Sequence, residues 1–217
     1  MKDQGKDHRY IAIEGAIGVG KTTLAQILAK ELKGRAILEK TDENPFLAKF
    51  YHQPERFAFQ TQLFFLFSRF RQQQELFQLD LFSKSTVLDY LFARDQIFAS
   101  INLNDEEFAL YQQIQQLLTG QIPKPDLVIY LQADPKTLFQ RIKKRGRDFE
   151  KEIEQEYLSL LIENYNQFFF NYNDSPLLII QTNDIDFVQS REELEDLLKQ
   201  IRMMKSGMQY YNPMQRD

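Results

Sequence analysis

A glycine-rich segment at residues 15–22, Gly-Ala-Ile-Gly-Val-Gly-Lys-Thr, carries the most specific chemical signal in the sequence. Its spacing matches the phosphate-binding pattern G-x-x-x-x-G-K-[ST], with a short apolar run before it and an amphipathic stretch after it. Glycines let the main chain curl so that several N–H groups point at a phosphate, and the following helix adds its positive dipole end. Lys21 is expected to reach the β- and γ-phosphates and Thr22 to hold Mg²⁺. The predicted nucleotide-binding residues here are Gly15, Ala16, Ile17, Gly18, Val19, Gly20, Lys21, Thr22 and Thr23.

The phosphate-binding pattern by itself does not separate kinases from GTPase switches or motors. A GTPase would carry a guanine-reading Asn-Lys-x-Asp string and a switch Asp-x-x-Gly string, and neither occurs in the sequence. Their absence favours a kinase that uses ATP with Mg²⁺.

Two carboxylates follow predicted strands of the same sheet. Glu39 comes just after the second strand and Asp89 just after the third. The carboxyl ends of parallel strands open into one ligand-binding crevice, so both side chains are expected near the phosphate loop. Phosphoryl transfer to a hydroxyl needs one carboxylate to accept a proton and one to help hold Mg²⁺. The alternative is that each merely caps a neighbouring helix or turn.

A basic run follows the fourth predicted strand. Arg141 and Arg145 are four residues apart, Lys143 and Lys144 lie between them, and Gly146 and Arg147 come next. Arg141 and Arg145 should share a helix face, and Gly146 is typical of a helix stop. We expect a lid of about residues 141–152 whose arginines neutralise charge on the transferring phosphate. The alternative is a solvated basic helix face.

Short apolar runs alternate with long amphipathic stretches along the chain, which predicts βα units around a parallel sheet. Strands are expected at residues 10–13, 36–38, 86–88, 127–131 and 177–180. Helices are expected at residues 22–32, 57–79, 105–118, 135–144, 153–170 and 191–201. The fold class is therefore α/β, a P-loop NTPase-type three-layer fold with a five-stranded parallel sheet flanked by helices.

Length and composition limit the remaining possibilities. The chain has 217 residues, a formal net charge of -4 and no cysteine. The length suits one domain, here residues 1–204 followed by a loosely held tail at 205–217. The acidic balance predicts neither nucleic acid nor an anionic membrane as a partner. The absence of cysteine suits a cytoplasmic protein, and no apolar run is long enough to span a bilayer.

Several further strings, taken in order and spacing, resemble the bacterial purine deoxynucleoside kinases, that is, the deoxyguanosine and deoxyadenosine kinases. The similarity extends from residue 10 to about residue 201. In addition to the phosphate loop, the matching strings are EKTDENPFL from Glu39, FYHQPERFAFQTQ from Phe50, FSRFRQ from Phe67, DYLFARDQIFA from Asp89, RIKKRGRDFE from Arg141 and NDIDF from Asn183.

The resemblance implies a function and roles for individual residues. It implies transfer of the ATP γ-phosphoryl group to the 5′-hydroxyl of a purine-preferring deoxynucleoside, in nucleotide salvage, by a homodimer. Glu39 matches the general base. Tyr51 and Glu150 match the residues that contact the sugar 3′-hydroxyl, and Gln62 and Arg69 match those that read the base edge. The lid arginines of the family are matched by Arg141, Arg145 and Arg147. The loop that holds the adenine is matched by residues 184–187, which include Asp184, Asp186 and Phe187.

The spacing of the base-reading residues agrees with that implication. Gln62 and Arg69 are seven residues apart and project from the same side of a helix, with Phe65 between them near that face. An amide, an aromatic ring and a guanidinium on one stripe suit a flat polar base, although aromatic stripes more often belong to a core.

One departure from the family pattern concerns the acceptor. Many members carry an acidic residue followed by Arg after the third strand, whereas Asp89 is followed here by Tyr90, as in the deoxyguanosine kinase branch. Arg94 is a candidate for the missing cation, and whether Arg94 or Asp95 faces the substrate stays open.

Two other functions compete with this interpretation. A nucleoside monophosphate kinase of the thymidylate kinase type would share the sheet and the lid, but the charge of Glu39 would repel a phosphate acceptor. A non-catalytic member of the fold is the second alternative, since one fold hosts many roles. Against it, Lys21, Thr22, Glu39 and the lid arginines are all present.

Overall fold

Six parallel strands form one sheet in the order β2-β3-β1-β4-β5-β6. The computed structural model describes residues 10–79, 85–147, 150 and 153–212. Part of the expected lid (148–149 and 151–152), the end of the expected tail (213–217) and residues 1–9 lie outside the described residues. The strands are β1 (Tyr10–Gly15), β2 (Arg35–Ile37), β3 (Thr86–Leu88), β4 (Leu127–Gln132), β5 (Leu177–Gln181) and β6 (Met208–Tyr211).

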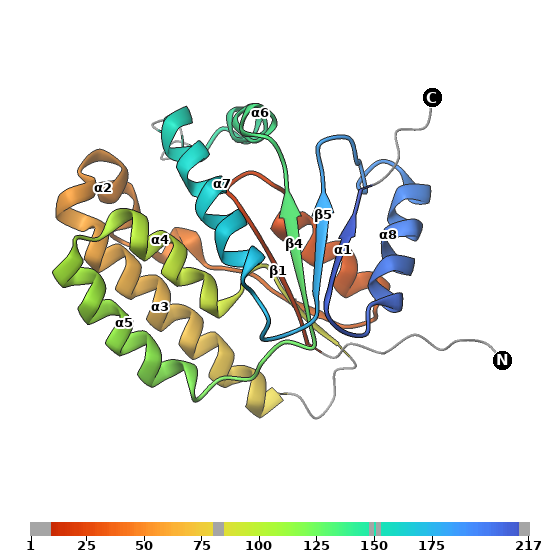
Figure 1. Cartoon of the computed structure of the whole chain (residues 1–217), viewed down its shortest axis with the longest axis horizontal. Coiled ribbons are helices and arrows are strands. Elements are labelled where there is room, and N and C mark those ends of the chain that lie inside the picture. The colour runs from red at the N-terminus through yellow and green to blue at the C-terminus, as the bar shows by residue number, and fades with distance from the viewer. Residues whose placement is uncertain (1–9, 80–84, 148–149, 151–152, 213–217) are drawn as a thin grey trace.

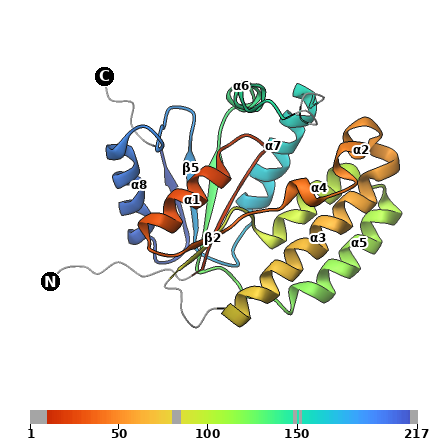
Figure 2. The ribbon, with the colours of Figure 1, turned by 180° about the vertical axis from the view of Figure 1, so that it is seen from behind.

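Helices cover both faces of this sheet (Figures 1 and 2). The two views agree that α1 and α8 lie on one side and that α3, α4, α5 and α7 lie on the other. The α-helices are α1 (Lys21–Glu31), α2 (Leu47–His52), α3 (Pro54–Leu79), α4 (Asp95–Asn102), α5 (Asp105–Thr119), α6 (Pro135–Arg145), α7 (Gln155–Phe170) and α8 (Arg191–Met203), and two short 3₁₀ helices are η1 (Thr41–Glu43) and η2 (Phe92–Arg94). The predicted three-layer α/β fold is confirmed.

The number of strands differs from the sequence-based expectation, which was five. The sixth strand, β6, comes from the segment expected to be a loose tail, and it pairs in parallel with β5 from Leu177↔Met208 to Ile180↔Tyr211. Its residues alternate between exposed and half-buried, because β6 is the edge strand of the sheet. A run of four residues with such partial burial gives almost no periodic signal, so only the pairing with β5 defines it.

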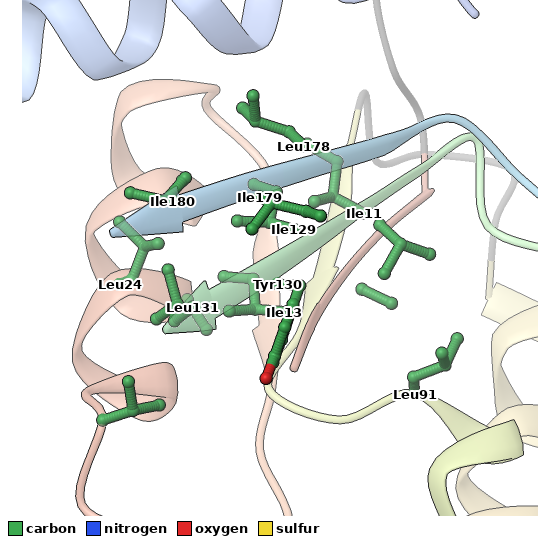
Figure 3. Packing of buried hydrophobic residues seen from close by; sticks show 14 of the residues in the cluster. Ile11, Ile13, Leu24, Leu91, Ile129, Tyr130, Leu131, Leu178, Ile179 and Ile180 are labelled. Carbon is green, nitrogen blue, oxygen red and sulfur yellow. The ribbon is translucent and has the colours of Figure 1, made fainter. Parts of the chain in front are cut away.

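The core explains why the central strands read as continuous apolar runs. Parallel strands covered by helices on both faces bury both sets of side chains. Figure 3 shows Leu131 and Ile180 near Leu24 of α1, whereas Leu91 lies across the sheet. These side chains are buried, and they fix the strand ends that carry the polar site residues.

Local signals set several helix boundaries. Pro135 begins α6, and the helix ends at Gly146, which adopts the left-handed conformation with φ 69°. Asn104 and Glu107 form a reciprocal capping box at the start of α5. The two helices that the sequence analysis did not predict, α2 and α4, have six and eight residues, too few for a clear 3.6-residue pattern.

Candidate active site

The phosphate loop connects β1 to α1 at the carboxyl edge of the sheet. Gly20, which precedes the helix, has φ 108°, a conformation that L side chains rarely adopt. A Cβ at Gly15 would lie 2.5 Å from the carbonyl oxygen of Leu131, so only glycine fits against β4. The ammonium group of Lys21 donates to the carbonyl oxygens of Gly15 (2.7 Å) and Ala16 (3.3 Å). Burial lowers the pKa of Lys21, although Glu14 opposes that effect.

Thr22 and Asp89 meet where α1 begins and β3 ends. The Thr22 hydroxyl donates to the Asp89 carboxylate at 2.5 Å, and the main-chain N–H of Glu39 donates to the other oxygen at 2.7 Å. Burial raises the pKa of Asp89, and these two hydrogen bonds act in the opposite direction. The two side chains that were predicted to hold Mg²⁺ are therefore adjacent.

The donor set at this point fits Mg²⁺ rather than a metal held by protein alone. No group of three or more His, Asp or Glu side chains is placed to hold a metal among the described residues. Mg²⁺ in phosphoryl-transfer sites is bound by one or two side-chain oxygens, phosphate oxygens and water. A hydroxyl and a carboxylate at the end of the phosphate loop match that requirement.

A cavity of about 440 Å³ lies next to the phosphate loop. Lys21 and Thr22 of the phosphate loop and Glu39 all line it, so the phosphate loop and the Glu39 carboxylate face one space. The predicted substrate-binding residues that line this cavity are Glu39, Tyr51, Gln62, Phe65, Arg69, Asp89, Arg94 and Glu150.

Glu39 is held by two arginines from different elements. Nη2 of Arg94 donates to both carboxylate oxygens of Glu39, at 2.6 and 2.7 Å, and Arg69 from α3 forms a second ion pair with it. Burial alone would raise the pKa of Glu39, but the charges of Arg69 and Arg94 outweigh it and hold the pKa at about 2. The carboxylate is thus ionised at neutral pH.

The α3 residues predicted to read a base gather on the same wall. The Arg69 guanidinium lies 5.1 Å from the centroid of the Phe65 ring. Gln62, one helical turn before Phe65, is buried. Asp95 does not line the cavity; it lies behind Arg69 and forms an ion pair with it. Arg94, by contrast, lines the cavity itself.

The residues predicted to bind a sugar also line this cavity. Arg145 donates to both oxygens of Glu150, at 2.9 and 2.5 Å, and Arg147 lies 3.9 Å from the same carboxylate. Tyr51 lines the cavity close enough for the charge of Glu150 to affect its pKa, which burial raises well above the ordinary value.

Arg141 lies apart from the other two lid arginines. It donates to the carbonyl oxygens of Thr182 (2.7 Å) and Val19 (3.4 Å), and it lines a second cavity of about 410 Å³. The expected shared face with Arg145 therefore does not bring the two guanidinium groups into one cavity. Arg145 ends α6 and turns towards Glu150, whereas the Arg141 side chain extends towards the phosphate loop.

The second cavity includes the segment predicted to hold adenine. Its walls are formed by Val19, Gly20, Thr23, Arg141 and residues 183–188, which include Asp184, Asp186 and Phe187. The side chain of Asp186 accepts hydrogen bonds from the main-chain N–H groups of Val188 and Gln189, and so shapes the loop. Val19 and Gly20 of the phosphate loop thus line this cavity as well.

Sequence reasoning missed two residues of this region. Tyr157 from α7 lines the first cavity, and its hydroxyl accepts a hydrogen bond from Asn102 at 3.3 Å. Glu14 is fully buried at the end of β1 and contacts Arg94 at 3.1 Å. A carboxylate inside an otherwise apolar strand was the available signal for Glu14.

The fold and the phosphate loop, whose residues line both cavities, define an ATP-dependent phosphotransferase of the P-loop class. The chain belongs to the deoxynucleoside kinase family, whose family model matches residues 11–205.

Relatives with assigned activities cover most of the chain. It is 38% identical over 200 residues to a deoxyguanosine kinase of Bacillus subtilis (strain 168), covering 89% of this chain and 96% of that protein. It is 32% identical to a deoxyadenosine/deoxycytidine kinase of the same organism, with 88% and 90% covered. The structure of deoxyadenosine kinase from M. mycoides with bound dATP superposes with a TM-score of 0.76 at 27% identity, covering 89% of this chain and 99% of that one.

Proposed function

We propose that this protein transfers the γ-phosphoryl group of ATP to the 5′-hydroxyl of a deoxynucleoside, with a preference for purines and deoxyguanosine as the first candidate. The observation that carries the proposal is that Lys21 and Thr22 of the phosphate loop and the carboxylate Glu39 line the same cavity. A neutral sugar alcohol suits a site whose acceptor end holds a carboxylate, whereas a phosphate acceptor would be repelled by it.

Glu39 acts as the general base. Its ionised carboxylate accepts the proton of the 5′-hydroxyl as the oxygen attacks the γ-phosphorus. Arg94 replaces the arginine that many family members carry directly after the acidic residue of the third strand. Its guanidinium holds Glu39 in place and stabilises the charge that develops on the 5′-oxygen.

The nucleotide occupies the phosphate loop and the second cavity. Main-chain N–H groups of residues 15–22 and the Lys21 ammonium bind the phosphates, and Arg141 with residues 183–187 encloses the adenine side. Thr22 and Asp89 hold Mg²⁺, directly or through water. A Mg²⁺ ion held there would supply positive charge that offsets the negative charge of the phosphate oxygens.

The deoxynucleoside occupies the first cavity. Tyr51 and Glu150 hydrogen-bond the sugar 3′-hydroxyl, Gln62 and Arg69 read the edge of the base, and Phe65 packs near its plane. Asp95 contributes through Arg69, whose orientation it fixes. Arg145 and Arg147 approach the transferring phosphate when the lid closes.

The protein works as a homodimer in the cytoplasm and has neither nucleic acid nor membrane as a partner. The net charge of -4 supports the absence of a polyanionic partner. None of the described helices combines the length and apolar character that crossing a bilayer requires.

A substrate panel tests the proposal. Purified protein is incubated with ATP, Mg²⁺ and each of the four deoxynucleosides, and the monophosphate products are quantified. We expect kcat/KM to be highest for a purine deoxynucleoside, with little phosphorylation of deoxyguanosine monophosphate. Faster turnover of a monophosphate acceptor would instead favour a nucleoside monophosphate kinase, and no ATP consumption with any acceptor would favour a non-catalytic role.

A further inference from the structure

Glu14 is a fully buried carboxylate on which four donors converge. Its Oε1 accepts hydrogen bonds from the Gly15 N–H (2.9 Å), the Tyr165 hydroxyl (3.0 Å) and Nη1 of Arg94 (3.1 Å). Its Oε2 accepts one from the Leu91 N–H at 2.8 Å. Glu14 therefore connects the strand before the phosphate loop, the segment that carries Arg94, and α7.

Arg94 lies between this buried carboxylate and the acceptor carboxylate. One terminal nitrogen, Nη1, donates to Glu14, and the other, Nη2, donates to both oxygens of Glu39. The guanidinium is planar and its two ends move together, so fixing Nη1 also fixes the direction in which Nη2 points. The Arg94 side chain is also stacked near Phe98, with 5.4 Å between its guanidinium carbon and the ring centroid.

Stability alone is a weak reason to keep this ion pair. Desolvating two charges costs about as much as their attraction returns, so apolar residues of similar volume often stabilise a core as well. Glu14 does not line either cavity beside the phosphate loop, whereas its partner Arg94 lines the first. Its contacts instead suit a group that holds a neighbouring side chain in a working orientation.

We propose that Glu14 is a positioning residue for phosphoryl transfer, which fixes the Arg94 guanidinium against Glu39 and the acceptor oxygen. The inference rests on the proposed function, because it assumes that Arg94 and Glu39 act on a 5′-hydroxyl. Glu14 thereby ties the acceptor side of the site to the strand that ends in the phosphate loop.

The informative substitution is Glu14→Gln. An amide offers one acceptor oxygen in place of two, and its NH₂ group would face the N–H of Leu91 or of Gly15. Arg94 keeps Glu39 but loses the second of its two charged partners, and with it the contact that fixes its direction, whereas the deoxynucleoside cavity keeps its lining. Since the lost contact serves only the transition state, we expect kcat to fall about 10- to 100-fold. The Kd for the deoxynucleoside, measured by calorimetry, should change less than about threefold.

Tyr165→Phe is the matched control, because it removes another donor to the same Glu14 oxygen and leaves the carboxylate and Arg94 paired. Its kcat should stay within about twofold of the wild-type value, and thermal midpoints of both variants must lie above the assay temperature. Should Glu14→Gln not fold, Glu14→Asp keeps the charge but withdraws it from Arg94, and it should lower kcat in the same way.

A double-mutant cycle with Arg94→Lys separates positioning from a general packing role. If Glu14 acts through Arg94, the double variant has about the same kcat as Arg94→Lys alone. Additive losses, an unchanged kcat in Glu14→Gln, or a Kd that rises as much as kcat falls would each overturn the inference. Failure of the wild-type protein to phosphorylate any deoxynucleoside would instead refute the proposed function, and the positioning role with it.

Discussion

The Arg94 guanidinium contacts both carboxylate oxygens of Glu39 through one nitrogen, at 2.6 and 2.7 Å. Together with Arg69, Arg94 keeps the Glu39 carboxylate ionised and fixed in direction. Preorganised charge of this kind lowers the reorganisation required when the proton moves.

Glu39→Gln should lower kcat by about 10²–10⁴-fold, because the amide cannot accept the proton of the 5′-hydroxyl. Nucleotide binding should persist, since Glu39 does not line the cavity next to residues 183–188. Steady-state kinetics with deoxyguanosine and a fluorescent ATP analogue measure the two effects. Turnover at the wild-type level would remove Glu39 from the role of base.

The ionisation of Glu39 should also appear in the pH dependence of stability. Its pKa falls from an ordinary value of 4.5 to about 2 in the folded protein, so its ion pairs stabilise fully above about pH 4.5. As the pH falls towards 2 the carboxylate becomes protonated and this contribution, on the order of 3 kcal/mol, is lost.

Urea unfolding of the wild type and of Glu39→Gln at pH 5 and pH 3 measures this loss. The difference in unfolding free energy between the two proteins should shrink at the lower pH. Asp174→Asn, which breaks an exposed pair with Lys124, serves as the control and should show a small difference at both pH values. If the difference in unfolding free energy between the wild type and Glu39→Gln is the same at pH 5 and pH 3, the prediction is contradicted.

Gln62→Ala should flatten the selectivity among deoxynucleosides. A site that hydrogen-bonds one base edge discriminates strongly, because a mismatched base leaves buried polar groups unpaired. The ratio of kcat/KM between the best and worst deoxynucleosides should fall by at least about tenfold. An equal loss of activity with all four deoxynucleosides would show that Gln62 supports the wall of the cavity without reading the base.

The lid arginines should separate into two kinetic classes. Arg141 lines the second cavity, whose walls include residues 183–188, so Arg141→Ala should mainly raise the KM for ATP. Arg145 pairs with Glu150 and lines the first cavity, so Arg145→Ala should mainly lower kcat, by about 10²-fold. Lys143→Ala on the same helix is the control with little expected effect. Identical changes in the two arginine variants would refute the division.

Asp89→Asn should raise the Mg²⁺ concentration needed for half-maximal activity by about tenfold or more, because a neutral amide is a weaker ligand for a hard cation. A titration of activity with Mg²⁺ at fixed ATP measures this shift. Excess EDTA should abolish wild-type turnover, and added Mg²⁺ should restore it. Unchanged Mg²⁺ dependence in the variant would exclude Asp89 from metal binding.

The sequence predicted the elements that carry strong local or periodic signals. The phosphate loop could be identified because its glycines and Lys21 are adjacent in the chain, and the central strands because both of their faces are apolar. Pro135 and Gly146 gave the limits of α6 to within one residue of the observed helix. The edge strand β6 and the short helices α2 and α4 were missed, since each depends on neighbours for its stability.

The sequence by itself thus determined the α/β class and the nucleotide-binding loop, and it predicted which residues would form an acceptor site. Only the tertiary structure decided how they pair: Glu39 with Arg94 and Arg69, Arg94 with Glu14, and Arg141 away from Arg145. These partners are separated by up to 80 residues along the chain. Their distances are set by strand order and helix packing, which local sequence patterns do not encode. Once buried, each charged side chain requires an oppositely charged partner, and the tertiary structure decides which one is within reach.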